Sequence, residues 1–388
     1  MFADRFNGVT GSAIRDIFKT IAQPGMISFA GGNPALDALE NDVIAGIADD
    51  VLRSDGKRIL QYGGSEGYTP LLEQAPLFLR ERGVDAAADT ILPVSGSTQA
   101  IDLLCKAFIN PGDTIIVEDP TFLGATQTMR LYQANLVPVA LDGDGVDPGE
   151  LERAIIKHKP KLVYLIPTFQ NPTGVTLSLE RRKVIAELAA KHNTYIIEDD
   201  PYRDLRYGGD ALPSIFSLAE PGRVIYLASF SKLISPGLRI AVMTTGGGDM
   251  RRKLVIGMQS TGLHSDQLAQ AITAEYLRRG LLPGHIKSIR GLYGEKLRLM
   301  LAGLAAMDKD IQCTIPQGGL FVWARLREGA DAFALLRKAV ERRVAFVPGT
   351  HFYVGGGHNE TLRLNFSNST AEDIKKGLDA LADAIRAF

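Results

Sequence analysis

Apolar residues between about residues 90 and 245 follow a pattern that predicts a sheet covered by helices on both faces. Short continuous runs of branched apolar residues, typical of strands buried on both sides, alternate with stretches in which apolar residues recur at helical spacing. Helical spacing is clear over residues 97–109 and 179–192. The predicted strands are residues 90–94, 114–117, 136–140, 162–166, 195–197, 224–228 and 239–244. This alternation favours a mostly parallel sheet.

The two ends of the chain predict a smaller α/β lobe. Residues 11–54 hold two helical patterns separated by an extended, glycine-rich stretch at 27–34. A helical region runs from residue 248 to about residue 307, and Pro283 is expected to divide it into two helices. The remainder predicts strands at 312–315 and 320–324, a helix at 332–342, strands at 344–347 and 362–365, and a final helix at 371–388.

Composition and charge exclude several classes of protein. The 388 residues carry 43 Lys and Arg against 44 Asp and Glu, so a net charge of -1 gives no general basic surface for nucleic acid or an anionic membrane. Cys105 and Cys313 are too few for a disulfide framework and suit a reducing cytoplasm. No apolar stretch approaches the ~20 residues that span a bilayer, and the N-terminus has no signal-peptide core. The six histidines show no paired metal-ligand spacing, and no GxGxxG follows the first strand, so we expect neither a metal nor a nicotinamide cofactor.

Four groups of polar residues follow predicted strands. The first is SGSTQ at 95–99, at the start of a helix. Small residues let the backbone approach an anion, and a helix N-terminus offers unpaired N–H groups and a partial positive charge. An ordinary serine helix cap accounts for the same residues.

The second group is SFSK at 229–232, directly after a predicted strand and followed by Arg239. A lysine at the carboxyl end of a strand lies where open α/β sheets bind ligands. It can form a Schiff base with an aldehyde when its surroundings lower its pKa. Ser229, Ser231 and Arg239 could contact a phosphate. The alternative is a solvated loop lysine.

The remaining groups are NPTG at 171–174 and EDDPY at 198–202. A carboxylate in the latter could keep a pyridinium nitrogen protonated, and the phenol that follows could hydrogen-bond a nearby oxygen. Taken separately, a turn and a polar loop explain them. All four groups follow strands of one sheet, so they can converge, and together they supply what a phosphorylated pyridine aldehyde needs.

These motifs resemble those of the class I/II aminotransferases, pyridoxal-phosphate enzymes of fold type I, and the resemblance covers nearly the whole chain. Within that family the sequence is similar to the branch containing 2-aminoadipate and kynurenine aminotransferases. Further strings that carry the resemblance are SAIR at 12–15, ISFAGG at 27–32, LQY at 60–62, DPTF at 119–122, PGLR at 236–239 and LRLNFS at 362–367. The lysine-containing string and NPTG are highly specific as a pair.

The resemblance implies a two-domain α/β fold. A large cofactor-binding domain at 51–282 would contain a mostly parallel seven-stranded sheet flanked by helices. A smaller α/β domain would come from both chain ends, with an N-terminal arm and part of this domain at 1–50 and the rest at 283–388.

The resemblance also implies a role for each site residue. Lys232 resembles the lysine that forms a Schiff base with pyridoxal 5'-phosphate and shuttles protons, and Asp199 would pair with the pyridine nitrogen. Tyr202 and Asn171 would hydrogen-bond the phenolic oxygen of the cofactor. The other implied cofactor contacts are Gly96, Ser97, Thr98, Ser229, Ser231 and Arg239 at the phosphate, Tyr62 at the phosphate of the neighbouring subunit's site, and Phe122 against the ring.

The residues implied in substrate binding are Arg363, Gly32, Asn171 and Arg15. The planar fork of Arg363 suits an α-carboxylate. Arg15 lies in a segment that caps the site in similar proteins, and a solvated helix arginine is the alternative. Two positions depart from the commonest pattern, since Phe122 stands where this branch often has tyrosine and Thr98 where many relatives have glutamine.

The implied activity is ping-pong transamination through the Lys232 Schiff base. An L-amino acid of the 2-aminoadipate, aromatic or large aliphatic type would give its amino group to a 2-oxo acid, and by analogy 2-oxoglutarate is an acceptor. If Tyr62 serves the neighbouring site, the protein is a homodimer with shared active sites. We expect a cytoplasmic enzyme with small-molecule substrates and no nucleic-acid or membrane partner.

Two other classes of function remain as alternatives. A carbon–sulfur lyase or a decarboxylase of the same fold would keep Lys232, Asp199 and Arg363. A non-enzymatic sensor is the second, since fused transcription regulators carry domains of this branch. The chain begins almost at the first family motif, which leaves no room for a DNA-binding domain, and its neutral charge also argues against that function.

Overall fold

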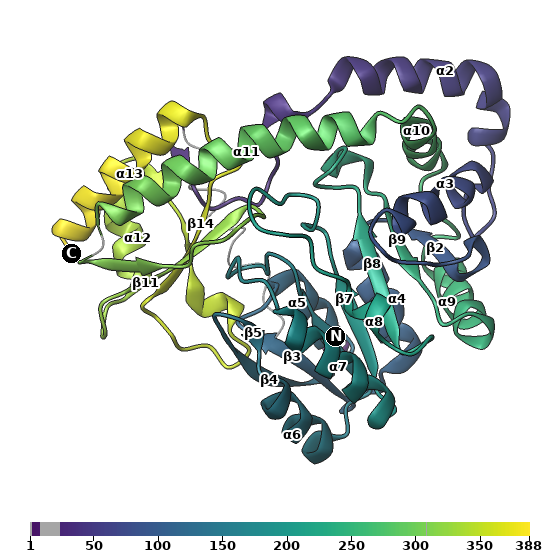
Figure 1. Ribbon diagram of the computed structural model, residues 1–388, viewed down its shortest axis with the longest axis horizontal. Coiled ribbons are helices and arrows are strands. Elements are labelled where there is room, and N and C mark those ends of the chain that lie inside the picture. Colours follow the sequence, from purple (N-terminus) through teal and green to yellow (C-terminus); the bar gives the residue numbers. More distant parts are fainter. Residues whose placement is uncertain (1, 8–23, 308) are drawn as a thin grey trace.

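The central element of the structure is a sheet of eight strands, with the spatial order β2-β9-β8-β7-β6-β3-β4-β5 (Figure 1). The computed structural model describes residues 2–7, 24–307 and 309–388. Strands β8, β7, β6, β3 and β4 run parallel, whereas β9 is antiparallel to both of its neighbours. In spatial order the strands are Ile91–Val94, Ala241–Thr244, Val224–Ser229, Tyr195–Asp199, Leu162–Leu165, Thr114–Asp119, Asn135–Asp142 and Gly145–Val146.

The predicted mostly parallel sheet is confirmed, with one strand added. The extra strand β5 is two residues long and pairs antiparallel with the end of β4, so it is too short to appear as an apolar run. The strand predicted at 239–244 begins only at Ala241. Arg239 has a φ of 53°, in the left-handed region, which is incompatible with a strand.

Helices cover both faces of this sheet because successive residues of a strand point to opposite sides. Along β6, Leu162 and Tyr164 belong to the apolar core that includes residues of α4, whereas Val163 and Leu165 belong to a second core with residues of α6 and α7. All four strand residues are buried. The helices of this domain include α4 (Ser97–Phe108), α5 (Leu123–Leu131), α6 (Pro148–His158), α7 (Leu179–Lys191) and α8 (Ile215–Leu218).

Both ends of the chain build the smaller lobe, as predicted. Its antiparallel sheet has the order β10-β11-β14-β13, with strands Ile311–Cys313, Phe321–Leu326, Thr361–Asn365 and Val347–Pro348. Strand β1 (Ile27–Ser28) pairs in parallel with β12 (Val344–Ala345) and joins the N-terminal segment to this lobe. Gly377 on α13 (Ala371–Arg386) makes room for that segment, because a Cβ at this position would lie 2.5 Å from the Phe29 ring. Helix α12 (Ala332–Glu341) packs against α13.

The strand predicted at 344–347 is two short strands in the structure. Val344 and Ala345 pair with β1, whereas Val347 and Pro348 pair with β14 in the other sheet. One continuous apolar run therefore serves two sheets, and the sequence alone does not reveal the change of partner.

A long helical region connects the two lobes (Figure 1). Its helices are α9 (Gly248–Thr261), α10 (Gln267–Arg278) and α11 (Leu282–Ala305). Pro283 lies in the first turn of α11, a position where a missing N–H costs nothing, so it separates two helices as predicted. The additional break at Gly262, after α9, was not predicted.

Helices α2 (Asn41–Ile59) and α3 (Thr69–Arg80) pack against α10. Short 3-10 helices lie at Asp4–Phe6 (η1), Leu36–Ala38 (η2), Ala88–Thr90 (η3), Pro236–Leu238 (η4) and Gly349–Phe352 (η5). The domain limits expected at residues 50 and 282 stay a prediction.

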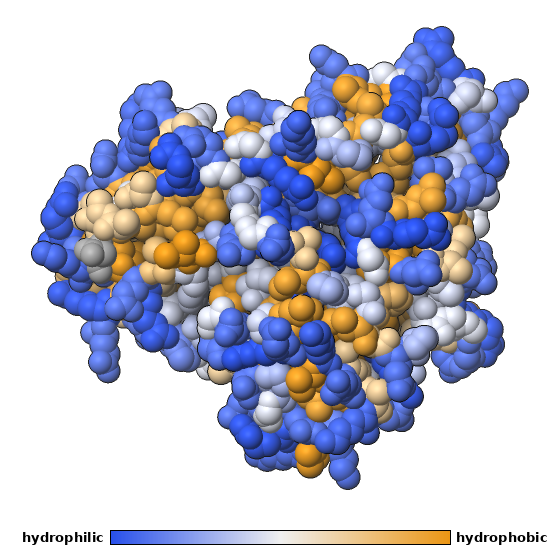
Figure 2. Space-filling view, viewed as in Figure 1, coloured by the Kyte–Doolittle hydropathy of each residue, from blue (hydrophilic) through white to orange (hydrophobic). Residues whose placement is uncertain are grey.

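Polar residues dominate the periphery of the face in Figure 2, and apolar residues gather toward its middle and over the smaller lobe. Within the described ranges, no helix combines the length and the apolar character needed to cross a membrane.

Candidate active site

A cavity of about 320 Å³ lies where the parallel strands end and the smaller lobe approaches them. This edge of an open α/β sheet is the usual place for a ligand. Most residues predicted for the site line this cavity, and these are Gly32, Ser97, Thr98, Phe122, Asn171, Asp199, Tyr202, Ser229, Ser231, Lys232, Arg239 and Arg363. They come from both lobes, so the cavity exists only because the lobes pack together.

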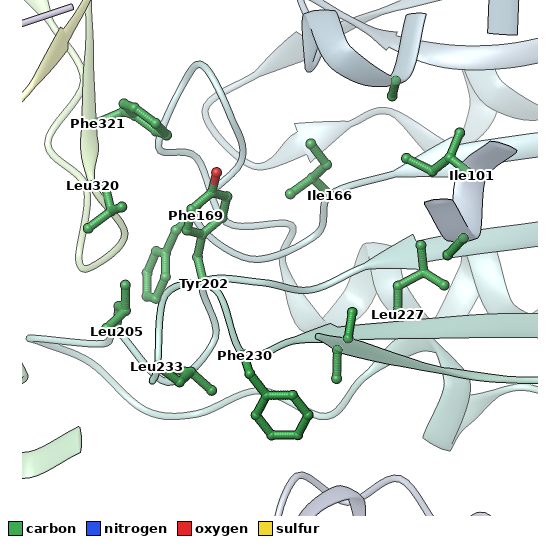
Figure 3. Close-up of a cluster of buried hydrophobic side chains, with 14 of the residues drawn as sticks. Ile101, Ile166, Phe169, Tyr202, Leu205, Leu227, Phe230, Leu233, Leu320 and Phe321 are labelled. Carbon is green, nitrogen blue, oxygen red and sulfur yellow. The ribbon is translucent and has the colours of Figure 1, made fainter. Parts of the chain in front are cut away.

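Buried apolar side chains form one wall of the cavity and continue beneath it. Figure 3 shows Ile166, Phe169 and Tyr202 between the ends of the sheet strands and Phe321 of the smaller lobe. The Tyr202 ring meets the Phe321 ring edge-on, with centroids 5.9 Å apart. This apolar wall keeps water from one side of the cavity, which strengthens electrostatic interactions inside it.

Lys232 lies in the turn that follows β8. Its Nζ donates a hydrogen bond to the carbonyl oxygen of Gly32 at 2.7 Å. Burial, and then the positive charges of Arg239 and Arg363, lower the pKa of Lys232 to about 8. Part of this amine is therefore neutral at neutral pH and available as a nucleophile.

Asp199 is the last residue of β7 and is fully enclosed. The Tyr164 hydroxyl donates to its Oδ2 at 2.8 Å, whereas Oδ1 is buried without a hydrogen-bond partner among the described residues. Burial raises the pKa of Asp199 to about 6, and the side chains of Tyr164 and Ser97 oppose the rise. The carboxyl group is therefore mostly ionised at pH 7 and has one oxygen free for a donor.

Arg363 enters the cavity from β14 between two aromatic rings. Its Cζ lies 4.2 Å from the centroid of Phe321 and 4.9 Å from that of Phe352. Nη2 donates to the Ala30 carbonyl at 2.8 Å and Nη1 to Asn171 Oδ1 at 2.9 Å. Burial lowers the pKa of Arg363 to about 10, so the group stays charged at neutral pH. Its Nε is buried and has no partner in the described part of the chain, which suits an incoming anion.

Asn171 connects Arg363 to Tyr202. Besides accepting from Arg363, its Nδ2 donates to the Tyr202 hydroxyl oxygen at 3.4 Å. The asparagine precedes a cis proline, Pro172, in a tight loop. Burial raises the pKa of Tyr202, so its phenol remains protonated and can donate a hydrogen bond.

The other end of the cavity suits an anion. Gly96 precedes α4 with a φ of 79°, and a Cβ there would lie 2.3 Å from Arg239 Nη2. Arg239 Nη1 donates to Ser231 Oγ at 3.3 Å, and the Ser97 hydroxyl is buried without a described partner. The free N–H groups of the α4 N-terminus and the Arg239 charge thus face the same space.

Two predicted residues, Gly96 and Tyr62, stand apart from the cavity lining. Gly96 abuts Arg239 but does not itself line the cavity. Tyr62 is 80% exposed, and its ring meets His264 edge-on at 6.3 Å. Arg15, also predicted for the site, lies outside the described residues.

Several residues of the site were not predicted. The cavity is also lined by Asn33, Ile166, Pro201 and Phe321. Tyr164 does not line it but donates a hydrogen bond to Asp199, which does. Ile166 directly follows β6 and Pro201 lies two residues after the end of β7, positions that could have marked them. Tyr164 looks like any apolar strand residue, and Phe321 reaches the site only through the packing of the lobes.

The free polar atoms of the cavity fit pyridoxal 5'-phosphate. Asp199 Oδ1 can accept a hydrogen bond from the pyridine nitrogen, the α4 N-terminus with Arg239 can hold the phosphate, and the Lys232 amine can bind the aldehyde. Asp199, Arg239 and Lys232 all line the same cavity, so the space between them is open to a ligand.

Comparison with known proteins identifies the family. The family model described as aminotransferase class I and II matches residues 24–381. The chain is 39% identical to aromatic-amino-acid aminotransferase 1 of Thermococcus litoralis, over 99% of this chain and 94% of that protein.

Two solved structures superpose closely on the chain. One is the kynurenine aminotransferase of Pyrococcus horikoshii in complex with PMP, at a TM-score of 0.95 and 36% identity, covering 100% of this chain and 97% of that one. The other is the alpha-aminoadipate aminotransferase of Thermus thermophilus with N-(5'-phosphopyridoxyl)-L-leucine, at a TM-score of 0.93, 36% identity and the same coverage, 100% and 97%.

The match extends over both lobes and therefore over every element that lines the cavity. The expected fold, cofactor and class of reaction are confirmed by these relatives. The chain belongs to the class I and II aminotransferases of fold type I, and it is a pyridoxal-phosphate-dependent transaminase that acts on small molecules.

Proposed function

We propose that the cavity is the amino-transfer site and that the donor is a 2-aminoadipate, aromatic or large aliphatic L-amino acid. The acceptor is a 2-oxo acid, with 2-oxoglutarate among those used. The observation that carries the proposal is the convergence of Lys232, Asp199 and Arg363 on one cavity in which Asp199 Oδ1 and Arg363 Nε lack partners among the described residues. The names of similar proteins, which specify aromatic amino acids, kynurenine and alpha-aminoadipate, support the donor range.

The residues around the cofactor divide its binding among them. When bound, pyridoxal 5'-phosphate supplies an aldehyde that condenses with amines and a pyridinium ring that withdraws electrons. Asp199 would accept a hydrogen bond from the protonated pyridine nitrogen, and Asn171 and Tyr202 would donate to the phenolic oxygen. Gly96 and Arg239 would hold the phosphate, together with Ser97, Thr98, Ser229 and Ser231, and Phe122 would lie against the ring.

Two further residues act on the substrate. Arg363 would bind its α-carboxylate and so hold the α-carbon near Lys232, since Arg363 donates to the Ala30 carbonyl and Lys232 to the Gly32 carbonyl of the same segment. Lys232 Nζ would hold the proton that leaves the substrate α-carbon and release it again, while the bound cofactor would supply the electron-withdrawing ring. A pKa of about 8 lets the amine both accept and release that proton near neutral pH.

A panel of amino donors assayed with 2-oxoglutarate tests the substrate proposal. We expect glutamate from 2-aminoadipate, from aromatic or from large aliphatic amino acids, with one molecule of 2-oxo acid formed for each glutamate. The same panel without an acceptor should release at most one 2-oxo acid per site and no ammonia. Absence of glutamate with every donor would refute the acceptor, and steady release of pyruvate and ammonia from cystathionine would favour a lyase.

We also propose a homodimer in which Tyr62 reaches the phosphate of its partner's site. Tyr62 is highly exposed, and its ring contacts His264. Two further exposed apolar side chains are near them in sequence, Leu60 near Tyr62 and Leu263 next to His264. Tyr62 does not line the cavity of its own chain, although family resemblance implies that it binds cofactor. A second chain would account for both observations, because Tyr62 would then bind the cofactor in the cavity of its partner.

Mixed dimers test the shared site. Tyr62→Ala should weaken cofactor binding about 10-fold, since it removes a hydrogen bond to a charged group, and Lys232→Ala should be inactive. A dimer of one Tyr62→Ala chain with one Lys232→Ala chain then has one complete site, so at a cofactor concentration that leaves the Tyr62→Ala parent mostly unloaded its activity should exceed that of either parent dimer. Activity no higher than the parents', or a fully active monomer by light scattering, would refute a shared site.

The cellular location that we propose is the cytoplasm. Cys105 and Cys313 are free thiols, and Cys105 is buried, as suits a reducing compartment.

A further inference from the structure

A buried tyrosine outside the cavity holds the carboxylate at its base. Tyr164 lies on β6 and Asp199 on the neighbouring strand β7. The Tyr164 hydroxyl donates to Asp199 Oδ2 at 2.8 Å, and both side chains are buried. Tyr164 does not line the cavity, so it cannot touch a ligand there.

The two oxygens of Asp199 therefore differ. Oδ2 is occupied by Tyr164, while Oδ1 is buried and free of partners among the described residues. A carboxylate in such a place must lose hydration, and hydrogen bonds to its ionised form are what offset that loss. A tyrosine is suited to this because burial raises its own pKa far above neutrality, so it remains a donor at every working pH.

We propose that Tyr164 is a positioning residue for the cofactor, whose hydroxyl keeps Asp199 ionised and directs Oδ1 toward the pyridine nitrogen. This inference rests on the proposed role of Asp199. Without the hydroxyl, Asp199 would keep its proton up to a higher pH and would offer a negative charge to the pyridinium group only above that pH.

The other groups around Asp199 do not replace this hydrogen bond. The titratable and polar groups that face it are Tyr164 on β6, Ser97 on α4, Glu118 on β3, and Asp200 and Tyr202 after the end of β7. Asp200 raises the pKa of Asp199, and burial raises the pKa of Glu118 to about 8, so that Glu118 is neutral at pH 7. Among the described groups, the nearby Ser97 side chain also favours the ionised form, but it makes no hydrogen bond to Asp199, and Tyr164, which does, has the larger effect.

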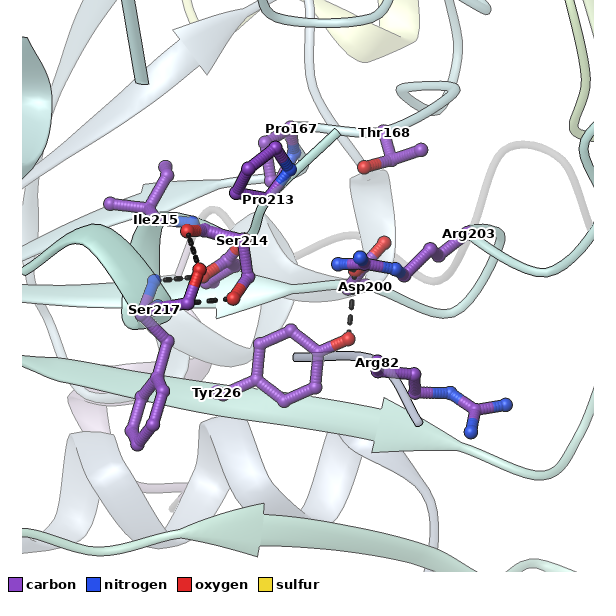
Figure 4. Close-up of polar contacts among 12 residues, drawn as sticks. Arg82, Pro167, Thr168, Asp200, Arg203, Pro213, Ser214, Ile215, Ser217 and Tyr226 are labelled. Carbon is purple, nitrogen blue, oxygen red and sulfur yellow. Dashed lines mark hydrogen bonds and ion pairs between the residues drawn. The ribbon is translucent and has the colours of Figure 1, made fainter. Parts of the chain in front are cut away.

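A second tyrosine–aspartate pair in the same sheet provides a matched control. Tyr226 on β8 donates to Asp200 Oδ2 at 2.8 Å, and both residues are buried (Figure 4). Asp200 does not line the cavity. Removing the Tyr226 hydroxyl therefore removes the same kind of buried hydrogen bond but leaves the hydrogen bond to Asp199 in place.

The test measures cofactor binding rather than turnover. Cofactor-free wild type, Tyr164→Phe, Tyr226→Phe and Asp199→Asn are titrated calorimetrically with 4'-deoxypyridoxine 5'-phosphate between pH 5 and 9. This probe has no aldehyde, so Lys232 cannot join it and contributes no pH dependence of that kind. Thermal unfolding of each cofactor-free protein reports on the fold.

Wild-type affinity should fall as the pH drops through about 6, where Asp199 gains its proton. In Tyr164→Phe the fall should begin one to two pH units higher, giving an affinity loss of about 10- to 100-fold below pH 6 that disappears near pH 9. Tyr226→Phe should not move the fall to higher pH, because an Asp200 that keeps its proton longer repels the charge on Asp199 less. A Tyr164→Phe profile equal to wild type, or a loss equal at every pH, would overturn the inference.

Asp199→Asn separates this inference from the proposed function. Weak binding is expected, with only the pH dependence that the phosphate of the probe itself contributes. Together with a wild-type profile for Tyr164→Phe, this result would refute Tyr164 alone. Wild-type binding by Asp199→Asn would refute the role of Asp199 itself. If Tyr164→Phe does not fold, para-aminophenylalanine at position 164 keeps a donor and should preserve the wild-type profile, whereas para-fluorophenylalanine has none and should shift it. Identical profiles for that pair would also overturn the inference.

Discussion

Replacing Lys232 with alanine is expected to reduce transamination by about 10,000-fold or more. The variant loses the only amine of the described cavity lining that can both bind the cofactor aldehyde and move the substrate proton. Its visible absorbance band, which reports the bond between protein amine and cofactor, should also disappear. Steady-state rates and absorbance spectra of the purified variant measure both effects.

Two further variants separate loss of chemistry from loss of fold. Lys232→Arg keeps a positive charge but cannot supply a neutral amine, so it should be as inactive as the alanine variant. Lys253→Ala removes an exposed lysine from α9 and should retain wild-type activity. Substantial turnover by Lys232→Ala, with the band intact, would contradict the proposed role.

Replacing Arg363 with lysine is expected to lower kcat/KM for amino acids by about 100- to 1,000-fold. The guanidinium is held by Asn171 and Ala30 and stacks between two rings, and an ammonium cannot reproduce this planar, two-sided arrangement. Truncating a buried, hydrogen-bonded charge costs about 2–5 kcal/mol, and the expected loss in kcat/KM lies within that range. Steady-state kinetics with donor and acceptor each varied would measure it.

The effect should depend on the carboxylate of the substrate. Amines that lack an α-carboxylate should react equally slowly with wild type and Arg363→Lys, since neither protein can use the contact. Arg325→Lys is a matched control, because Arg325 lies on the neighbouring strand β11 with its side chain exposed. An equal loss with carboxylate-free amines, or an unchanged kcat/KM for amino acids, would refute this assignment.

The order of helices and strands could be predicted wherever all residues of a segment are buried in the same way. Strand β8 is buried at every residue, so its apolar run is unambiguous. The run at 344–347 predicts one strand, because no residue in it marks where the pairing partner changes from β1 to β14. Strand β5 was missed for a related reason, since its two residues pair only with the end of β4.

The site was predictable where residues follow the strands of one sheet. Lys232 and Asp199 stand at such ends, and the structure brings them to one cavity. Phe321 comes from the smaller lobe, and its position depends on how the lobes pack, which local sequence does not specify. Tyr164 has the pattern of an ordinary core residue, and only the 2.8 Å contact with Asp199 distinguishes it.

The central claim is that Lys232 is the residue that joins the cofactor in this cavity. The most direct test is borohydride reduction of the cofactor-loaded protein, followed by proteolysis and mass spectrometry of the labelled peptide. Reduction makes the bond between amine and cofactor permanent, so the label marks the lysine itself. A single phosphopyridoxyl group on Lys232, one per chain, is the predicted result. Labelling of a different lysine, or no stoichiometric label, would contradict the account.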